Sequence, residues 1–303
     1  MAKINWDESA NLDKLAELSI KTGVALQPGQ DLLISAPLEA APLVRRLAIH
    51  AYKAGAGIVT PLYTDPEVVL ARYKNASESS FEKTTEWLFE GMAYAFDNNT
   101  ARLAIVGEDP LLLSGQDPEN VSRANKAMSK ASSPIRERIT RFDVNWNIIA
   151  WPGMMWAKRI FPQMSDDDAQ KALANAIFKA SRVTNPDPIK AWNEHNSDLR
   201  QRTDWLNKKN FSALHFYGEG TDLIVGLADE HEWMGGASLA RNGIMCNPNI
   251  PSEEVFTTPH TLKVNGYVKS TKPLSYQGTL IEDIAVKFED GVIIKASASK
   301  GEE

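Results

Sequence analysis

Short apolar runs alternate with stretches of helical periodicity through the first 110 residues. The runs 31–35, 58–63 and 102–107 predict buried strands. Between and before them, apolar residues recur every three or four positions over 12–23, 39–54 and 81–95, which predicts helices. Strands separated by helices of about 10–15 residues are typical of βαβ units. The N-terminal region is therefore predicted to be α/β, with a mostly parallel sheet.

The middle of the chain is more helical. A strand is predicted over 144–151. Ser165, with Asp168 three residues later, resembles a capping box, and an apolar stripe over 169–177 follows it. Two prolines in the run 185–188 should end that helix, and a polar helix is expected over 189–209. We place the domain boundary at this run, giving an α/β N-terminal domain over 1–185 and a second domain over 186–303.

The pattern changes to strands after residue 210. The runs 212–217 and 221–227 predict a hairpin around Gly218 and Gly220, and the runs 261–270 and 279–295 continue as strands. Asp290-Gly291 is a typical tight turn between two strands. The expected fold class is thus α/β followed by a β-rich (α+β) C-terminal region.

Composition excludes several classes of protein. The 303 residues are 43% hydrophobic and 24% charged, as in a globular chain, and the formal net charge is −6. Lysines and arginines are scattered, which argues against a nucleic-acid partner. No apolar run could cross a membrane, and residues 1–8 do not resemble a secretory signal. The single cysteine, Cys246, cannot form an internal disulfide, and a cytoplasmic location is expected.

Common catalytic motifs are missing from the sequence. It contains no phosphate-binding G-x-x-x-x-G-K-[ST], no G-x-G-x-x-G and no G-x-S-x-G. Cys246 has no histidine nearby and is predicted to be a buried structural thiol. His195 is predicted to be exposed on the polar helix, and His215 to be a sheet residue.

Metal-binding residue types gather in the run Asp-Glu-His-Glu over 229–232. The zinc motif on a helix needs a second histidine four residues after His231, and Gly235 stands there. A solvated loop is favoured, and a metal role for this run stays open.

The segment 246–260 combines prolines and asparagines with two adjacent carboxylates, Glu253 and Glu254. The prolines predict a rigid, irregular segment. Neighbours in an extended segment point to opposite sides, so one of the two at most faces a given site. A rigidly held carboxylate suits a metal ligand or a general base. A charged surface turn is the alternative.

Several of these runs together resemble one family, the metalloaminopeptidases that include aminopeptidase T and aminopeptidase S. The resemblance is carried by residues 214–223, 226–227, 233–236 and, most specifically, by Asn-Pro-Asn-Ile-Pro-Ser-Glu-Glu-Val-Phe-Thr-Thr-Pro over 247–259. It extends to 12–23, 87–92, 191–196 and the closing Lys-Gly-Glu-Glu over 300–303.

The resemblance implies a cytoplasmic exopeptidase that removes N-terminal residues from peptides. It implies two divalent metal ions per site (zinc, cobalt, manganese or magnesium), an α/β N-terminal domain, a C-terminal catalytic domain and a homodimer. Matched to the family's motif, the first metal ligand is Glu254, with Glu253 as the alternate. Other catalytic residues are not assigned.

The sequence departs from the family where it stops. Family members continue beyond a Lys-Gly-Glu-Glu like this one, and the continuation holds further Glu, His and Asp ligands. One carboxylate cannot hold a catalytic metal pair. We therefore expect residues 1–303 to be an incomplete, inactive portion that self-associates.

The rivals are a non-catalytic protein that binds peptides or a partner on the same scaffold, and an α/β enzyme using 229–232. If residues 1–303 nevertheless showed metal-dependent cleavage, the missing ligands would be sought among His215, His231 and Asp229.

Overall fold

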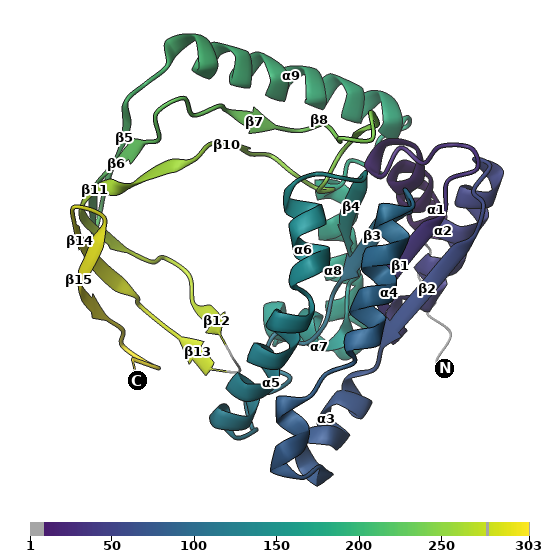
Figure 1. The fold of residues 1–303 in the computed structure, drawn as a ribbon, viewed down its shortest axis with the longest axis horizontal. Helices are drawn as coiled ribbons and strands as arrows, with labels where there is room; N and C mark the ends of the chain where they lie inside the picture. The colour runs from purple at the N-terminus through teal and green to yellow at the C-terminus, as the bar shows by residue number, and fades with distance from the viewer. Residues whose placement is uncertain (1–8, 277–278, 303) are drawn as a thin grey trace.

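The N-terminal part of the chain is built on a four-stranded parallel sheet. A computed structural model describes residues 9–276 and 279–302, so the opening 1–8 and the final residue of the closing motif lie outside it. The strands are β1 (Leu32–Pro37), β2 (Val59–Thr64), β3 (Ala101–Val106) and β4 (Trp146–Ala150), in the order β2-β1-β3-β4 (Figure 1). All three pairings are parallel, which confirms the predicted α/β class.

Helices cover both faces of this sheet because alternate residues of β1 point to opposite sides. Leu32 and Ile34 join a core with α1, α2 and α8, whereas Leu33 packs with Met92 and Phe96 of α4 and with α6. The helices are α1 (Ser9–Leu18), α2 (Ala41–Lys53), α3 (Pro66–Asn75), α4 (Glu86–Asp97), α5 (Pro118–Ala131), α6 (Ser133–Thr140), α7 (Met154–Ile160) and α8 (Asp166–Ala180).

Local signals set several helix boundaries. The Ser165 hydroxyl accepts a hydrogen bond from the Asp168 N–H at the start of α8, which confirms Ser165 as the N-cap. A π-helical turn (Ser19–Gly23) follows α1 and ends at Gly23, the last residue of the helix predicted over 12–23. Short 3-10 turns precede α2 (Leu38–Ala40) and α4 (Glu78–Glu82).

The predicted helix over 81–95 is wrong at its start. Phe81 lies in the 3-10 turn before α4, where it is buried and stacks on Tyr73 of α3 at a centroid distance of 5.1 Å. The Arg72 guanidinium donates to the Ser80 and Lys83 carbonyls. These bonds hold the 3-10 turn against α3, and α4 begins only at Glu86.

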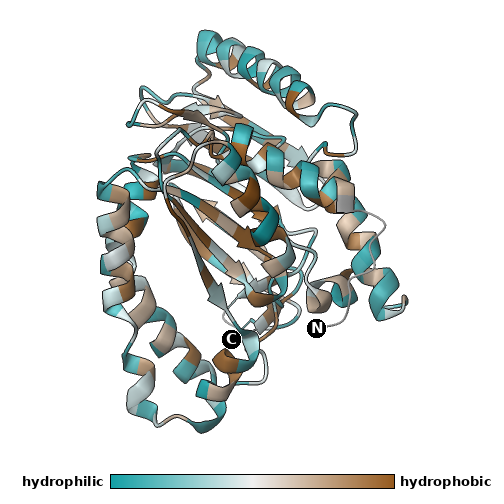
Figure 2. Cartoon of the chain, turned by 90° about the vertical axis from the view of Figure 1, so that its right-hand side faces the viewer, coloured by the Kyte–Doolittle hydropathy of each residue, from teal (hydrophilic) through white to brown (hydrophobic). Residues whose placement is uncertain are grey.

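One long helix, α9 (Pro188–Lys209), leads from the N-terminal domain to the second region (Figure 1). It is largely hydrophilic, as the helix at the top of Figure 2 shows. Trp192, in its first turns, nevertheless belongs to the main N-terminal core. The helix ends at Asn210 in the left-handed conformation, with φ of 48°. The predicted polar helix is confirmed, and the domain boundary near residue 185 stays a prediction.

The C-terminal region holds a five-stranded antiparallel sheet. Its strands are β5 (Ala213–Gly218), β6 (Thr221–Leu227), β11 (Pro259–Lys269), β14 (Ala285–Glu289) and β15 (Val292–Ser297), in the order β15-β14-β11-β6-β5. Asp290 and Gly291 both have positive φ, as the tight turn between β14 and β15 requires. The predicted β-rich region is confirmed.

Three short strand pairs complete the described residues. They are β7 (Met234–Gly235) with β10 (Val255–Phe256), β8 (Ser238–Leu239) with β9 (Met245–Cys246), and β12 (Leu274–Tyr276) with β13 (Thr279–Ile281). The strands β7, β8 and β10 run below α9, between the two sheets (Figure 1). Among the described residues, no helix is long and apolar enough to cross a membrane.

Candidate metal-ligand site

The segment that carries Glu253 and Glu254 is anchored on the N-terminal sheet. The Ile148 N–H donates to the Pro248 carbonyl at 2.7 Å, and the Ile250 N–H donates back to the Ile148 carbonyl at 3.0 Å. The segment thereby extends the sheet beside β4 with one parallel bridge. Ile250 is buried in the main core. The prediction of a rigid, irregular segment is therefore confirmed.

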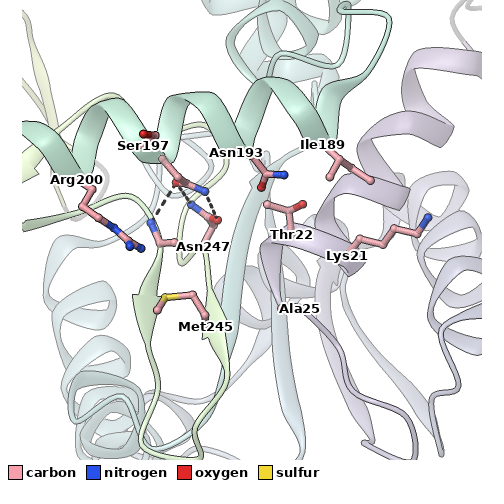
Figure 3. Close-up of a pocket in the computed structure, with 11 residues that line it drawn as sticks. Lys21, Thr22, Ala25, Ile189, Asn193, Ser197, Arg200, Met245 and Asn247 are labelled. Atoms are coloured by element: carbon pink, nitrogen blue, oxygen red, sulfur yellow. Dashed lines mark hydrogen bonds between the residues drawn. The ribbon is translucent and has the colours of Figure 1, made fainter.

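A pair of buried or half-buried asparagines ties the same segment to α9. Asn196 and Asn247 exchange side-chain hydrogen bonds of 3.0 and 2.8 Å (Figure 3). The Asn196 oxygen also accepts from the Ala237 N–H at 3.2 Å. These residues form one wall of a polar cavity of about 450 Å³ that Arg200 and Lys21 also line.

Glu253 is occupied by an ion pair. Arg182 donates to its two carboxylate oxygens at 2.6 and 3.0 Å, and the His195 ring lies 3.7 Å away. The hydrogen bond from Arg182 lowers the pKa of the Glu253 carboxyl, against the opposing effect of desolvation. A carboxylate in a two-pronged arginine pair is less available to a metal ion.

His195 is buried, which corrects the prediction that it is exposed. It lies three residues after Trp192, so it shares the face of α9 that packs on the N-terminal domain. Its Nε2 donates to the Ser252 carbonyl at 2.7 Å, and its Nδ1 lies 3.1 Å from an Arg182 nitrogen. The sequence analysis missed this contact face because most residues of α9 are polar.

Glu254 has different surroundings from its neighbour. It is exposed, and among residues 9–276 and 279–302 its carboxylate has no hydrogen-bond or ion-pair partner. Glu253 faces α9 through His195, and Val255 faces it across a groove lined by Trp205 and Leu206. Because side chains alternate along an extended segment, Glu254 points away from α9.

The residues that the structure describes supply only part of the ligand set that a metal ion needs. A rigidly held carboxylate without a partner suits one ligand position. Across the described part of the chain, however, no group of three or more His, Cys, Asp or Glu side chains could hold a metal. Catalytic sites generally need about three protein ligands, so Glu254 alone does not complete one.

The rival metal run over 229–232 is a loop, as the solvated interpretation predicted. Asp229 pairs with Lys263 at 3.5 Å, and the His231 Nδ1 is 2.9 Å from the Ala228 carbonyl. His215 pairs with Asp222 at 2.8 Å on the β5–β6 hairpin. These side chains do not gather around a common point that could hold a metal.

Cys246 is structural, as predicted. It is buried, and burial raises the pKa of its thiol to about 11. The thiolate is therefore scarce at neutral pH, which excludes an activated nucleophile here.

Arg182 is the residue that sequence reasoning missed. Its backbone has a φ of 62°, just after the end of α8. Glycine usually takes this position, because a side chain is disfavoured there. No signal in the sequence marked it, because the helix was predicted to end only at the prolines of 185–188, beyond Arg182.

The acidic segment that carries Glu253 and Glu254 is thus anchored between a parallel α/β region and an antiparallel sheet. The family described as thermophilic metalloprotease (M29) matches residues 8–303. The chain belongs to this family.

Similar proteins support the same assignment. Aminopeptidase T of Thermus thermophilus is 46% identical over 293 residues, covering 97% of this chain and 72% of the relative. Aminopeptidase 2 of Geobacillus stearothermophilus is 39% identical, covering 98% of this chain and 72% of the relative. The solved structure of wild-type AmpT from Thermus thermophilus superposes with a TM-score of 0.92 at 45% identity, covering 97% of this chain and 73% of that one.

Proposed function

We propose that this protein is a metal-dependent aminopeptidase that releases N-terminal residues from peptides, with Glu254 as a metal ligand. The observation that carries the ligand assignment is the contrast between two adjacent carboxylates. Glu253 is held by Arg182, whereas Glu254 has no partner within residues 9–276 and 279–302 and points away from α9. Membership of a metalloprotease family and two relatives named as aminopeptidases support the reaction.

No further ligand is assigned among the residues that the structure describes. The relatives are longer than their match to this chain, which spans 72% of each. A divalent ion, when bound, supplies Lewis-acid activation of a water and of the peptide carbonyl.

Finer properties follow from the family resemblance. We propose two divalent ions per site, drawn from zinc, cobalt, manganese or magnesium. We also propose a homodimer in the cytoplasm, where the free, buried Cys246 would stay reduced. Peptides are the proposed substrates, without a nucleic-acid or membrane partner.

The reaction is tested with the protein purified at its natural length. We expect it to release the first residue of a peptide with a free amino terminus and to leave the N-acetylated peptide intact. A chelator should abolish the release, and Mn²⁺, Co²⁺ or Zn²⁺ should restore it. Release that survives chelation, or peptide binding without any release, would contradict the proposal; the latter would favour the non-catalytic rival.

A further inference from the structure

The position just after α8 is occupied by an arginine in a backbone conformation that favours glycine. The Val183 N–H donates to the Phe178 carbonyl at 3.1 Å, which closes the end of α8. Arg182 adopts a φ of 62° to make this possible. A non-glycine residue in this region is disfavoured unless its surroundings over-determine it. Closing the end of α8 therefore does not by itself account for an arginine at position 182.

The Arg182 guanidinium is held on several sides. Its Nη1 donates to Glu253 Oε1 at 2.6 Å and to the Ala180 carbonyl at 3.2 Å. Its Nη2 donates to Glu253 Oε2 at 3.0 Å and lies 3.1 Å from His195 Nδ1. The group also lies over the Trp192 ring, 5.4 Å from its centroid. A planar cation with this many contacts has one orientation, and so does the carboxylate that it binds.

His195 fixes the preceding residue. A carbonyl only accepts, so the 2.7 Å contact with Ser252 requires His195 Nε2 to donate. In the neutral imidazole Nδ1 then accepts from Arg182, which satisfies both ring nitrogens at once. The ring packs edge-on against Trp192, 5.4 Å between centroids. One rigid unit thus holds the Ser252 backbone and the Glu253 side chain.

The chain is also held directly after Glu254. The strand β10 pairs with β7, placing Val255 opposite Gly235. A Cβ atom at position 235 would lie 2.7 Å from the Glu254 carbonyl oxygen, so the glycine permits this close approach. Glu254 is therefore fixed at both sides of its backbone, while its own carboxylate has no partner among the described residues.

We propose that Arg182 and His195 are positioning residues that set the direction of the Glu254 carboxylate by clamping Ser252 and Glu253. This inference rests on the proposed function, because it gives the clamp its purpose in holding a metal ligand. Neither residue touches the metal or the substrate in this account. Each acts through the two residues that precede Glu254.

The clamp is tested first without metal, by hydrogen exchange of the backbone amides. Arg182→Met keeps the apolar stem and removes the guanidinium, and Arg182→Lys keeps the charge but loses the two-pronged pair. We expect exchange over 250–258 to rise about tenfold in Arg182→Met and less in Arg182→Lys. The matched control is Arg138→Met, which removes the two-pronged pair with Asp97 (2.7 and 2.6 Å) in the N-terminal domain. It should leave 250–258 unchanged.

The affinity for Mn²⁺ then tests whether the clamp orients the Glu254 carboxylate or only anchors the backbone. In the protein at its natural length, Arg182→Met should weaken Mn²⁺ binding by about 10–100-fold, as loss of a residue that orients a ligand does. Arg138→Met should not weaken it. Unchanged exchange over 250–258 in Arg182→Met, or faster exchange with unaltered Mn²⁺ affinity, would overturn the inference. Normal Mn²⁺ affinity in Glu254→Gln would instead contradict the ligand assignment itself, so the two failures are distinguishable.

Discussion

At the scale of single residues, the adjacent side chains of Glu253 and Glu254 have different surroundings and therefore different proposed roles. Both are exposed glutamates in one extended segment, yet one lies beside a cation and the other does not. The difference follows from the alternation of side chains and from an arginine 71 residues away in sequence. The sequence motif limits the candidate metal ligand to Glu253 or Glu254. The ion pair between Glu253 and Arg182 then favours Glu254.

Asp109 gives a prediction for acid stability. Burial raises the pKa of its carboxyl, but hydrogen bonds from Arg159 and from the Leu111 N–H outweigh it, so the pKa lies below the usual 3.8. A depressed pKa stabilises the fold above the unfolded value, and the contribution is lost as pH falls through the folded value. Asp109→Asn should therefore lower the free energy of unfolding by about 1 kcal/mol at pH 7.

The difference between Asp109→Asn and the unsubstituted protein should persist down to the usual carboxyl pKa and shrink below it. Urea denaturation of both proteins, at neutral pH and at pH values below 3.8, measures this. A difference that grows on acidification would show that the pair does not act as described.

Residue roles were predictable where they depend on local sequence. Cys246 was predicted to be a buried structural thiol because no histidine lies near it in the sequence. His195 was predicted wrongly, because its burial depends on Trp192 reaching the N-terminal core and on Arg182 arriving from another helix. Contacts between segments that are far apart in the sequence cannot be predicted from the spacing of residues within one segment.

At the scale of elements, most boundaries follow from caps, breakers and periodicity. Ser165, Gly23 and Asp290-Gly291 act as their chemistry predicts. The prolines of 185–188 do not end α8, which stops at Ala180, and Pro188 instead begins α9. The two-residue strands β7, β8, β9 and β10 were not predictable, since pairing with distant segments creates them. Phe81 was misplaced for a similar reason, because Tyr73 and Arg72 hold it outside α4.

The cap of α8 provides a test at this scale. Ser165→Ala removes the hydroxyl that accepts from Asp168 N–H at 3.3 Å, so it should lower the free energy of unfolding by about 1 kcal/mol. Ser197→Ala, at an exposed interior position of α9, is the matched control and should be neutral or slightly stabilising, since alanine is the better helix former. Equal effects of the two substitutions in urea denaturation would contradict the capping role.

At the scale of the whole molecule, the two regions differ in how they bury apolar residues. The parallel sheet lies inside two helical layers, whereas Leu227 is the buried large apolar residue in the five antiparallel strands. Val292, Ile293 and Ile294 on the edge strand β15 are 60%, 55% and 49% exposed. An exposed apolar edge strand favours association with another surface.

Residues 1–303 expressed alone should therefore self-associate. Sizing chromatography with light scattering should show species larger than a monomer, and Ile293→Lys should shift them toward the monomer by placing a charge on β15. The control Ile49→Lys changes an isoleucine on α2 that is similarly exposed, at 52%, and should leave the distribution unaltered. A monomer at every concentration would contradict the expectation.

The predicted division near residue 185 can be tested by limited proteolysis. Trp192 and Leu199 bury the first part of α9, whereas Lys208 and Lys209 lie exposed at its end. Trypsin should therefore cut at these lysines before it cuts within 9–185, and replacing both with glutamine should delay the first cut. Earlier cleavage inside the N-terminal half would argue against the division.

The central claim is that a metal-dependent aminopeptidase uses Glu254 as a ligand. The most direct test is the rate at which the protein, at its natural length and with Mn²⁺, releases the N-terminal residue of a peptide. Glu254→Gln should lower this rate about a hundredfold or more while leaving the fold intact, because an amide is a weaker ligand than a carboxylate. Glu232→Gln, in the rival acidic loop, should keep the rate of the unsubstituted protein. Equal rates in Glu254→Gln and the unsubstituted protein would contradict the account.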